Sequence, residues 1–348
     1  MKEVKPFIET LAFSILGGVI FFILNLPLPW MLGPLTSVML WNGLTNRRLL
    51  WPSYLKNAGL IVLGMSFGLY FTMATIQAIG PYLIPYVILT FLLIIISIIN
   101  SLFVSKFIRV DEITSVFGSI PGGLTEMVIA SESLQANAAY VMVFQTIRLI
   151  VVLFTVPFII LYVFSSENGQ TMELLVETSA TFFSFNVLWL VIPIVLGVRF
   201  QNLLPAGIMI IPLAITAGLN IGPVTIPSIP NSLFLAAQLC VGTSLGKSIS
   251  LKDVKFAGKF GLIYAGLAFL LIFISFGFGY ILYSLTSMDL PTALLSTAPG
   301  GLVEMVLTAS IVNADPAVVT SLQLTRIILI IVFVPVSLKW YFNRIYKT

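Results

Sequence analysis

Two long stretches of this 348-residue chain contain no charged side chain, and they constrain its fold more than any other feature. Residues 57–105 and 200–246 lack Asp, Glu, Lys and Arg altogether. Each stretch is long enough for two membrane-spanning helices of about 20 residues. Over the whole chain only 9% of residues are charged and 59% are hydrophobic, whereas a soluble domain has about 25% charged residues. The sequence therefore predicts an integral membrane protein and excludes a soluble enzyme or transcription factor.

The residues that the chain lacks exclude several kinds of chemistry. It contains no histidine, which is the commonest general base and a common ligand for zinc and copper. Cys240 is the only cysteine, so neither an internal disulfide bond nor an iron–sulfur cluster is expected. The net charge of +4 is typical of membrane proteins that hold Lys and Arg on the cytoplasmic side, and it does not indicate binding of nucleic acid. We expect no enzymatic activity, no metal and no cofactor.

Apolar segments of helical length run along the whole chain. In lipid every backbone polar group must be bonded internally, which favours helices. Ten segments predict spans, at residues 7–26, 30–44, 57–76, 81–104, 138–163, 182–200, 206–219, 231–247, 260–285 and 317–338. Two further apolar segments, 112–134 and 290–312, are interrupted in the middle by Pro-Gly-Gly.

The second half of the chain repeats the first at a constant shift of 178 residues. Pro-Gly-Gly-Leu-Thr-Glu-Met-Val at 121–128 corresponds in this way to Pro-Gly-Gly-Leu-Val-Glu-Met-Val at 299–306. Between residues 111–157 and 289–335, 17 of 47 positions are identical. Biased composition raises the number of chance matches, but it does not place Asp, Glu, Gln and Arg in one register. The sequence thus indicates a duplicated membrane unit.

The positions of the basic residues predict how the two copies are oriented. Lys and Arg prefer short cytoplasmic loops. If each Pro-Gly-Gly segment enters the membrane and returns to the same side, each half crosses five times and the second half is inverted. That arrangement puts 15 of the 17 basic residues inside and leaves only Arg148 and Arg326 within spans. Full crossing of each segment would instead put 10 inside and 5 outside, so the re-entrant arrangement is favoured.

These patterns predict an all-α polytopic membrane protein built from two inverted repeats, each with five transmembrane helices and one re-entrant hairpin. The first membrane repeat spans residues 1–164, an external linker spans 165–180, and the second membrane repeat spans 181–348. We expect a multi-pass protein of the bacterial cytoplasmic (inner) membrane, with both termini in the cytoplasm.

The two hairpin tips form the strongest candidate site. They comprise Pro121, Gly122 and Gly123 in the first repeat and Pro299, Gly300 and Gly301 in the second. Proline ends the incoming half-helix, and the glycines permit unusual backbone angles and close approach of a ligand. The next half-helix begins there, so its free N–H groups predict an anion-binding position. Inverted repeats with broken helices near the midplane are typical of secondary transporters.

Glu126 and Glu304 lie one turn into the second half-helix of their hairpins. An ionisable group inside a span is costly and is by default a functional hypothesis. Such a carboxylate could carry a coupling proton or supply oxygen ligands to Na⁺. The alternative is a purely structural role, in which local N–H groups or the arginines at 148 and 326 satisfy the two carboxylates.

Arg148 and Arg326 follow the hairpins, each three residues after a glutamine, Gln145 or Gln323. That spacing places each glutamine and arginine on one helix face. A planar guanidinium and an amide together suit the binding of a substrate carboxylate. The alternative is that each arginine neutralises a hairpin glutamate. Both can hold if substrate displaces an internal ion pair.

Weaker patterns repeat with the same shift. The Gly-x-Ser-x-Gly motifs at 64–68 and 242–246 predict close helix packing. The alternative is local unwinding that exposes serine hydroxyls and carbonyl groups. Good capping residues precede the hairpins and the helices after them: Asp111, Asp289, Asn137 and Asp315.

The duplicated Pro-Gly-Gly motifs at 121–128 and 299–306 resemble those of the AbrB family of bacterial membrane proteins, and the resemblance covers nearly the whole chain. It implies a tandem duplication of one membrane unit. Family members are often labelled ammonia monooxygenase or regulator of gene expression. The first label conflicts with this sequence, because a copper monooxygenase needs histidine ligands. The second finds no support in it, because no DNA-binding module or basic soluble face is visible. The family supplies no established catalytic residues.

The sequence predicts a secondary active transporter of a small organic anion, a carboxylate, coupled to H⁺ or Na⁺. Its expected partners are that anionic substrate, the coupling ion and the lipid bilayer, with no nucleic acid; a homo-oligomer stays open. Three alternatives remain: a membrane-embedded sensor that regulates gene expression by binding a small ligand, a channel and, least favoured, a membrane enzyme.

Overall fold

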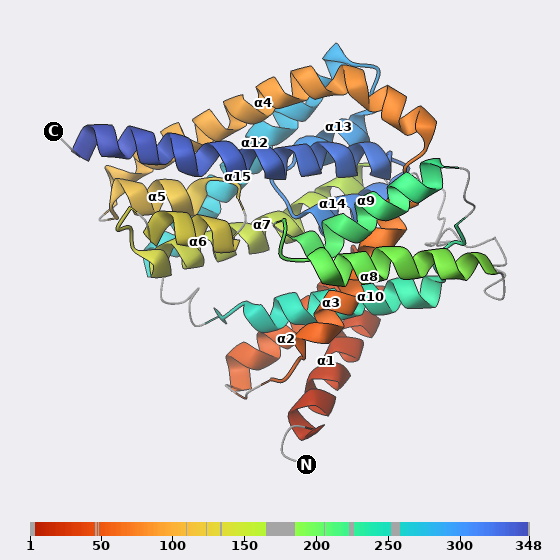
Figure 1. Cartoon of the computed structure of the whole chain (residues 1–348). Helices are drawn as coiled ribbons and strands as arrows, with labels where there is room; N and C mark the ends of the chain where they lie inside the picture. Colours follow the sequence, from red (N-terminus) through yellow and green to blue (C-terminus); the bar gives the residue numbers. More distant parts are fainter. Residues whose placement is uncertain are drawn as a thin grey trace. The chain divides into compact units, whose positions relative to one another are not determined.

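A computed structural model of the chain is helical, with no β-strand among the residues that it describes (Figure 1). It describes residues 4–45, 47, 49–108, 110–122, 124–132, 134–164, 185–204, 206–222, 226–251 and 258–346. The first repeat forms α1 (Val4–Ile23), α2 (Pro29–Thr45), α3 (Ser53–Gly68), α4 (Met73–Ser105), α5 (Glu112–Ser119), α6 (Leu124–Glu132) and α7 (Ala138–Phe164). The second forms η1 (Phe185–Leu190), α8 (Val191–Phe200), α9 (Gly207–Ile221), α10 (Asn231–Ser248), α12 (Gly258–Leu285), α13 (Leu290–Thr297), α14 (Leu302–Ile311) and α15 (Pro316–Tyr346).

Five of these helices have the length and apolar composition needed to cross a membrane, which supports a membrane protein. They are Val4–Ile23, Met73–Ser105, Ala138–Phe164, Gly258–Leu285 and, within α15, Pro316–Leu338. The other five predicted spans form α2, α3, α8, α9 and α10, which have 10 to 18 residues. At about 1.5 Å per residue these helices are shorter than the ~30 Å hydrocarbon core.

The chain folds into two compact units, and each unit takes helices from both repeats. The first unit comprises Met1–Ala78 and Leu161–Leu251, and the second comprises Ile79–Ile160 and Lys252–Thr348. The grouping by contacts therefore differs from the grouping by sequence repeat. The predicted linker at 165–180 lies outside the described residues.

The first unit is held by the same contacts made twice. Helix α3 packs against α9, and its repeat counterpart α10 packs against α2. A Cβ on Gly64 would collide with the carbonyl oxygen of Met209, and a Cβ on Gly242 would collide with that of Met31. These contacts are equivalent under the 178-residue shift. Both helices continue through their Gly-x-Ser-x-Gly motifs, so the prediction of close packing is confirmed.

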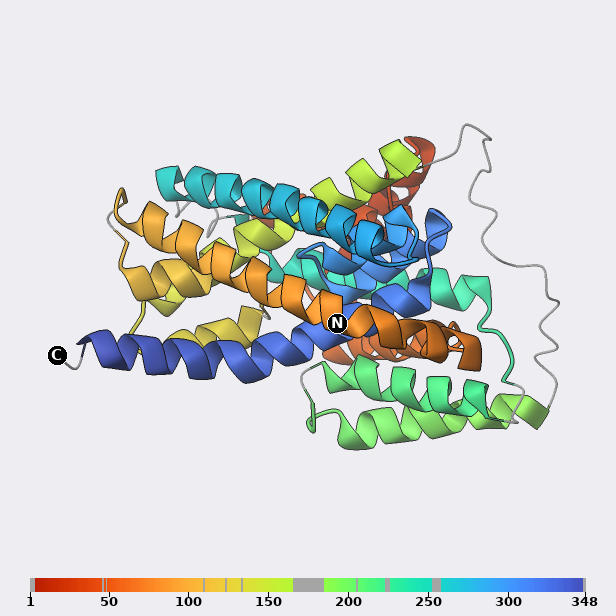
Figure 2. The same ribbon diagram turned by 90° about the horizontal axis from the view of Figure 1, so that it is seen from above.

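Neighbouring helix pairs in the first unit also make equivalent contacts in the two repeats. Helix α1 packs against α2, and α8 packs against α9; α8 and α9, both green, lie side by side in Figures 1 and 2. Proline lies inside α2 and α9 at equivalent positions, Pro34 and Pro212. The duplicated sequence thus produces duplicated packing.

The second unit contains the two hairpins, and each consists of two short helices. Helices α5, α6, α13 and α14 have 8, 9, 8 and 10 residues, or about 12–15 Å each at 1.5 Å per residue. Each is thus about half as long as a membrane-spanning helix.

The predicted caps are confirmed, and they define where the hairpins begin and end. Asp111 accepts a hydrogen bond from the backbone N–H of Thr114 at 2.7 Å, and Asp289 accepts one from that of Thr292 at 3.0 Å. Asn137 caps α7 and Asp315 caps α15. The threonine hydroxyls in turn accept from the backbone N–H groups of Asn137 and Asp315, each at 2.8 Å. The base of each hairpin is therefore closed by the same polar contact.

Candidate functional site

The two predicted tips lie between short helices, as expected. Helix α5 ends at Ser119 and α13 at Thr297. The next residues, Ile120 and Ala298, are extended with ψ of 132° and 134°, because a residue that precedes proline is disfavoured in the helical region. The second tip continues through Gly301, which is the N-cap of α14. Gly123 lies outside the described residues.

The first glycine of each tip makes room for a buried methionine. A Cβ on Gly122 would lie 2.8 Å from the Cγ of Met127, and a Cβ on Gly300 would lie 3.3 Å from the Cγ of Met305. Both methionines are fully buried. These two glycines thus allow the methionines to pack directly beneath the tips.

The glutamines hold the backbone at the end of the first half-helix. Gln145 Nε2 donates to the carbonyl oxygen of Phe117 at 2.6 Å, and Gln323 Nε2 donates to that of Leu295 at 2.7 Å. These carbonyls lie four residues before Pro121 and Pro299, which have no N–H to complete the intrahelical bond. The glutamine amide therefore replaces the hydrogen bond that proline removes.

The arginines bind the tip backbone from the same helix face. Arg148 donates to the carbonyl oxygens of Ile120 at 2.7 Å and Gly122 at 3.0 Å. Arg326 donates to the carbonyl oxygens of Ala298 and, at 2.7 Å, of Gly300. The prediction that each glutamine and arginine share a face is confirmed. Each guanidinium lies where the negative end of the first half-helix dipole favours a cation.

Glu304 occupies the position at which we expected an anion. Its carboxylate lies against the Cα of Gly301, so that a Cβ there would overlap it, and it accepts a hydrogen bond from its own backbone N–H. The free N–H groups at the start of α14 thus face a carboxylate that the chain itself supplies. The Glu126 side chain lies outside the described residues.

Three charged side chains of the second unit are buried without an ion-pair partner among the described residues. Arg148 is 7% exposed, Arg326 is 4% exposed and Glu304 is 5% exposed. The ion pair found in the described part of the chain joins Arg47 to Glu9, so Arg326 does not neutralise Glu304. Arg148 also lies close enough to Arg326 for their charges to interact. Buried charges of one sign are costly unless an opposite charge compensates them.

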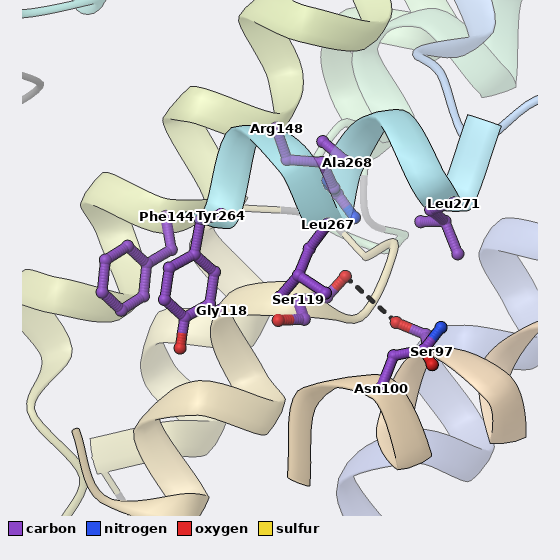
Figure 3. Close-up of a pocket in the computed structure, with 10 residues that line it drawn as sticks. All are labelled: Ser97, Asn100, Gly118, Ser119, Phe144, Arg148, Tyr264, Leu267, Ala268 and Leu271. Carbon is purple, nitrogen blue, oxygen red and sulfur yellow. Dashed lines mark hydrogen bonds between the residues drawn. The ribbon is translucent and has the colours of Figure 1, made fainter. Parts of the chain in front are cut away.

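A narrow pocket lies beside the first tip, and Arg148 forms part of its wall (Figure 3). Its volume is about 10 Å³, on the order of the space for one water molecule. The lining residues come from α4 (Ser97 and Asn100), α5 (Gly118 and Ser119), α7 (Phe144 and Arg148) and α12 (Tyr264, Leu267, Ala268 and Leu271). Ser97 donates to the carbonyl oxygen of Ser119 at 3.2 Å, and this bond links two walls (Figure 3).

Sequence reasoning missed most of this pocket, although a signal was present. Tyr264 donates a hydrogen bond to the hydroxyl of Ser115 at 2.7 Å, and Tyr86 donates to the carbonyl oxygen of Ser296 at 3.0 Å. The two tyrosines are 178 residues apart, so a tyrosine of each repeat contacts the hairpin of the other repeat. Polar residues that recur at equivalent positions inside apolar spans, such as Ser97 and Ser275, were the sequence signal for contacts between the long helices and the hairpins.

Comparisons with known proteins agree on one family. A model of the AbrB family, described as "Transition state regulatory protein AbrB", matches residues 30–342. The chain is 26% identical over 347 residues to "Uncharacterized protein YhjN" of Bacillus subtilis (strain 168), covering 93% of this chain and 90% of that protein. It is 29% identical over 230 residues to "Putative regulator AbrB" of Escherichia coli (strain K12), covering 64% of each. No solved structure matches. Because the family match extends over most of its length, this chain belongs to the AbrB family.

Proposed function

We propose that this protein is a secondary active transporter that moves a small carboxylate anion across the bacterial inner membrane. The observation that carries the proposal is the pair of buried guanidinium groups at the hairpin tips, Arg148 and Arg326, which have no carboxylate partner among the described residues. A substrate anion between or beside them would supply the missing charge, and arginine binds carboxylates well through its planar donor fork.

The inverted arrangement of the two repeats is part of this proposal. Three observations support it: the reciprocal packing of α3 on α9 and α10 on α2, the half-length of the hairpin helices, and the concentration of basic residues on one predicted side. Any two-fold relation between repeats, inverted or parallel, produces such reciprocal contacts, and the distribution of basic residues favours the inverted one. In transporters, broken helices of inverted repeats meet at a substrate site near the midplane.

Glu304 is the proposed coupling residue, together with its repeat counterpart Glu126. The Glu304 carboxylate is buried and covers the start of α14. Protonation would remove its charge, and Na⁺ would compensate it; either event would weaken its hold on the helix N-terminus and release the tip to change conformation. Ion and substrate would then bind in a linked way.

Uptake by proteoliposomes tests the coupling role. Purified protein should accumulate a labelled carboxylate against its gradient when a proton or sodium gradient is imposed, and an ionophore should abolish the accumulation. Glu304→Gln and Glu126→Gln should each remove the gradient-driven component. Glu132→Gln is the matched control, because Glu132 is exposed at the end of α6. Wild-type coupled uptake in both glutamine variants would refute the coupling role.

The proposed topology has an independent test. Both termini and the segment near Lys252 should be accessible from the cytoplasm, and the segment near Glu173 should be accessible from the periplasm. Single cysteines at these two positions, in a variant without Cys240, can be labelled with an impermeant maleimide in intact cells and in inverted vesicles. Periplasmic labelling near Lys252 would eliminate the inverted arrangement.

A membrane sensor is the second candidate, and the names of the family and of one relative favour it. The family description and the Escherichia coli relative both carry the word "regulatory" or "regulator". A sensor would bind a carboxylate at the same arginines without moving it. Specific binding with no flux in proteoliposomes would therefore favour the sensor, whereas flux that equilibrates but never concentrates the anion would favour a channel.

A further inference from the structure

The two hairpins differ at the groups that could hold a substrate. In the first hairpin the Nε of Arg148 and the Oε1 of Gln145 are buried and have no hydrogen-bond partner among the described residues. In the second hairpin the Nη2 of Arg326 donates to the Oε1 of Gln323, so the equivalent glutamine oxygen has a partner there. Among the described residues, the first hairpin therefore leaves a donor of its buried arginine and the neighbouring glutamine oxygen unused, whereas in the second hairpin the glutamine oxygen is used.

The surroundings of the two arginines differ in the same direction. Asn100 and Gly118 line the pocket at the first hairpin, and the equivalent positions of the second repeat hold Phe278 and Ser296. A Cβ on Gly118 would lie 2.8 Å from the ring of Phe144, so the glycine allows that ring to pack directly against α5. The second repeat has neither the asparagine nor the glycine.

The pocket lining combines polar and apolar groups. Ser97, Asn100, Ser119 and Arg148 provide polar groups, and Phe144, Tyr264, Leu267, Ala268 and Leu271 provide aromatic or aliphatic ones, with Phe144 and Tyr264 stacked at 3.5 Å between ring centroids. Arg148 is the one charged residue in the lining. A single carboxylate would be compensated there, whereas a second carboxylate on the same ligand would meet no cation in the lining.

We propose that the first hairpin alone binds substrate, and that the substrate is a monocarboxylate with a short apolar body. The carboxylate would accept hydrogen bonds from Arg148 and Asn100, and the apolar body would lie along the side formed by Leu267 and Leu271. The pocket in this structure has space for about one water molecule, so binding of such a substrate requires α4 to move away from the first tip, which breaks the long bond between Ser97 and Ser119. The second hairpin then contributes the coupling carboxylate Glu304 but does not contact the substrate. This inference rests on the proposed transport of a carboxylate and specifies its site and substrate class.

Ligand-induced thermal stabilisation of detergent-purified protein tests the site, because a ligand that binds the folded state raises its apparent stability. The probes are the potassium salts of butyrate and succinate, with neutral butyramide as the uncharged isostere of butyrate. We expect butyrate to stabilise the protein and the other two compounds to give a shift at least several-fold smaller at equal concentration. Equal stabilisation by butyramide would overturn the role of the charge, and equal stabilisation by succinate would overturn the preference for one carboxylate.

Two substitutions locate the site. Asn100→Phe introduces the residue of the second repeat and should weaken butyrate binding at least ten-fold; Asn100→Asp, which is nearly isosteric, should weaken it comparably by placing an anion beside Arg148. Phe278→Asn is the matched control and should bind butyrate like the wild type. Wild-type binding by a folded Asn100 variant would overturn the proposal, as would an equal loss in folded Phe278→Asn.

The outcomes also separate this inference from the proposed function. Butyrate binding that depends on Asn100 but is accompanied by no flux would retain the site and reject transport. Coupled carboxylate flux that is unaffected by Asn100→Phe would retain transport and reject the site at the first hairpin.

Discussion

Replacing the tip glutamines with methionine tests whether they hold the hairpins together. Gln323→Met and Gln145→Met keep the approximate length of the side chain but remove its donors. The Leu295 and Phe117 carbonyls then lose the glutamine hydrogen bonds of 2.7 and 2.6 Å. Proline four residues later cannot replace those bonds, because it has no N–H.

The structure predicts that the two variants are not equally destabilised. Leaving one buried carbonyl unsatisfied costs about 1–3 kcal/mol, and both variants incur this cost. Gln323→Met also removes the acceptor of a hydrogen bond from Arg326, and a hydrogen bond to a charged group contributes a further ~1.5–3 kcal/mol. The Oε1 of Gln145 has no partner among the described residues, so Gln145→Met has no such second cost. Gln323→Met should therefore be the less stable variant.

Thermal unfolding in detergent, followed by intrinsic fluorescence at one scan rate, provides the comparison. Unfolding of membrane proteins is often irreversible, so the apparent transition temperatures are compared only within this series. Gln77→Met is the control, because Gln77 is exposed on α4 and a surface substitution usually changes stability by less than ~0.5 kcal/mol. Equal shifts for the two tip variants, or a shift no larger than that of Gln77→Met, would refute the assignment of these bonds.

Two further predictions concern packing and capping. Gly242→Ala should destabilise the first unit by about 1–3 kcal/mol, because the new Cβ overlaps the carbonyl oxygen of Met31. Gly266→Ala is the control: it has open space around it and should be neutral or stabilising by up to ~1 kcal/mol. Equal transition temperatures for the two variants would contradict the packing argument. Asp289→Ala should cost about 1 kcal/mol through loss of the hydrogen bond from Thr292, measured by the same thermal assay, and Asp289→Asn should recover most of it; a variant Asp289→Ala as stable as the wild type would show that the cap is dispensable.

The hairpins could be predicted from sequence because their causes are local. Proline removes a backbone donor and constrains the residue before it, so the ends of α5 and α13 follow from Pro121 and Pro299. Capping residues such as Asp111 act over three or four positions. The three-residue spacing of glutamine and arginine also predicts a shared face, and the structure brings each pair to the tip of the preceding hairpin.

The partners of the charged groups could not be predicted in the same way. The positions of Arg326 and Glu304 in the sequence allow an ion pair, but in the structure the arginine donates to backbone carbonyl groups of the tip, and the carboxylate lies over Gly301. These carbonyl groups are free to accept because Pro299 interrupts the helix. Since every residue has a backbone carbonyl, the residue types in the sequence do not reveal which carbonyls are free.

The sequence by itself determined the membrane class, the duplication, the half-helix hairpins and their caps. Long uncharged segments, prolines and capping residues act within a short stretch of chain, and the duplication is visible when the sequence is compared with itself. Only the tertiary structure decided that each compact unit combines helices of both repeats, that Tyr264 of the second repeat reaches the hairpin of the first, and that Arg148 lines a pocket with a donor that no described residue uses. These features depend on which helices meet after folding, and hydrophobic burial of an almost uniformly apolar surface is too unspecific to reveal that from residue types alone.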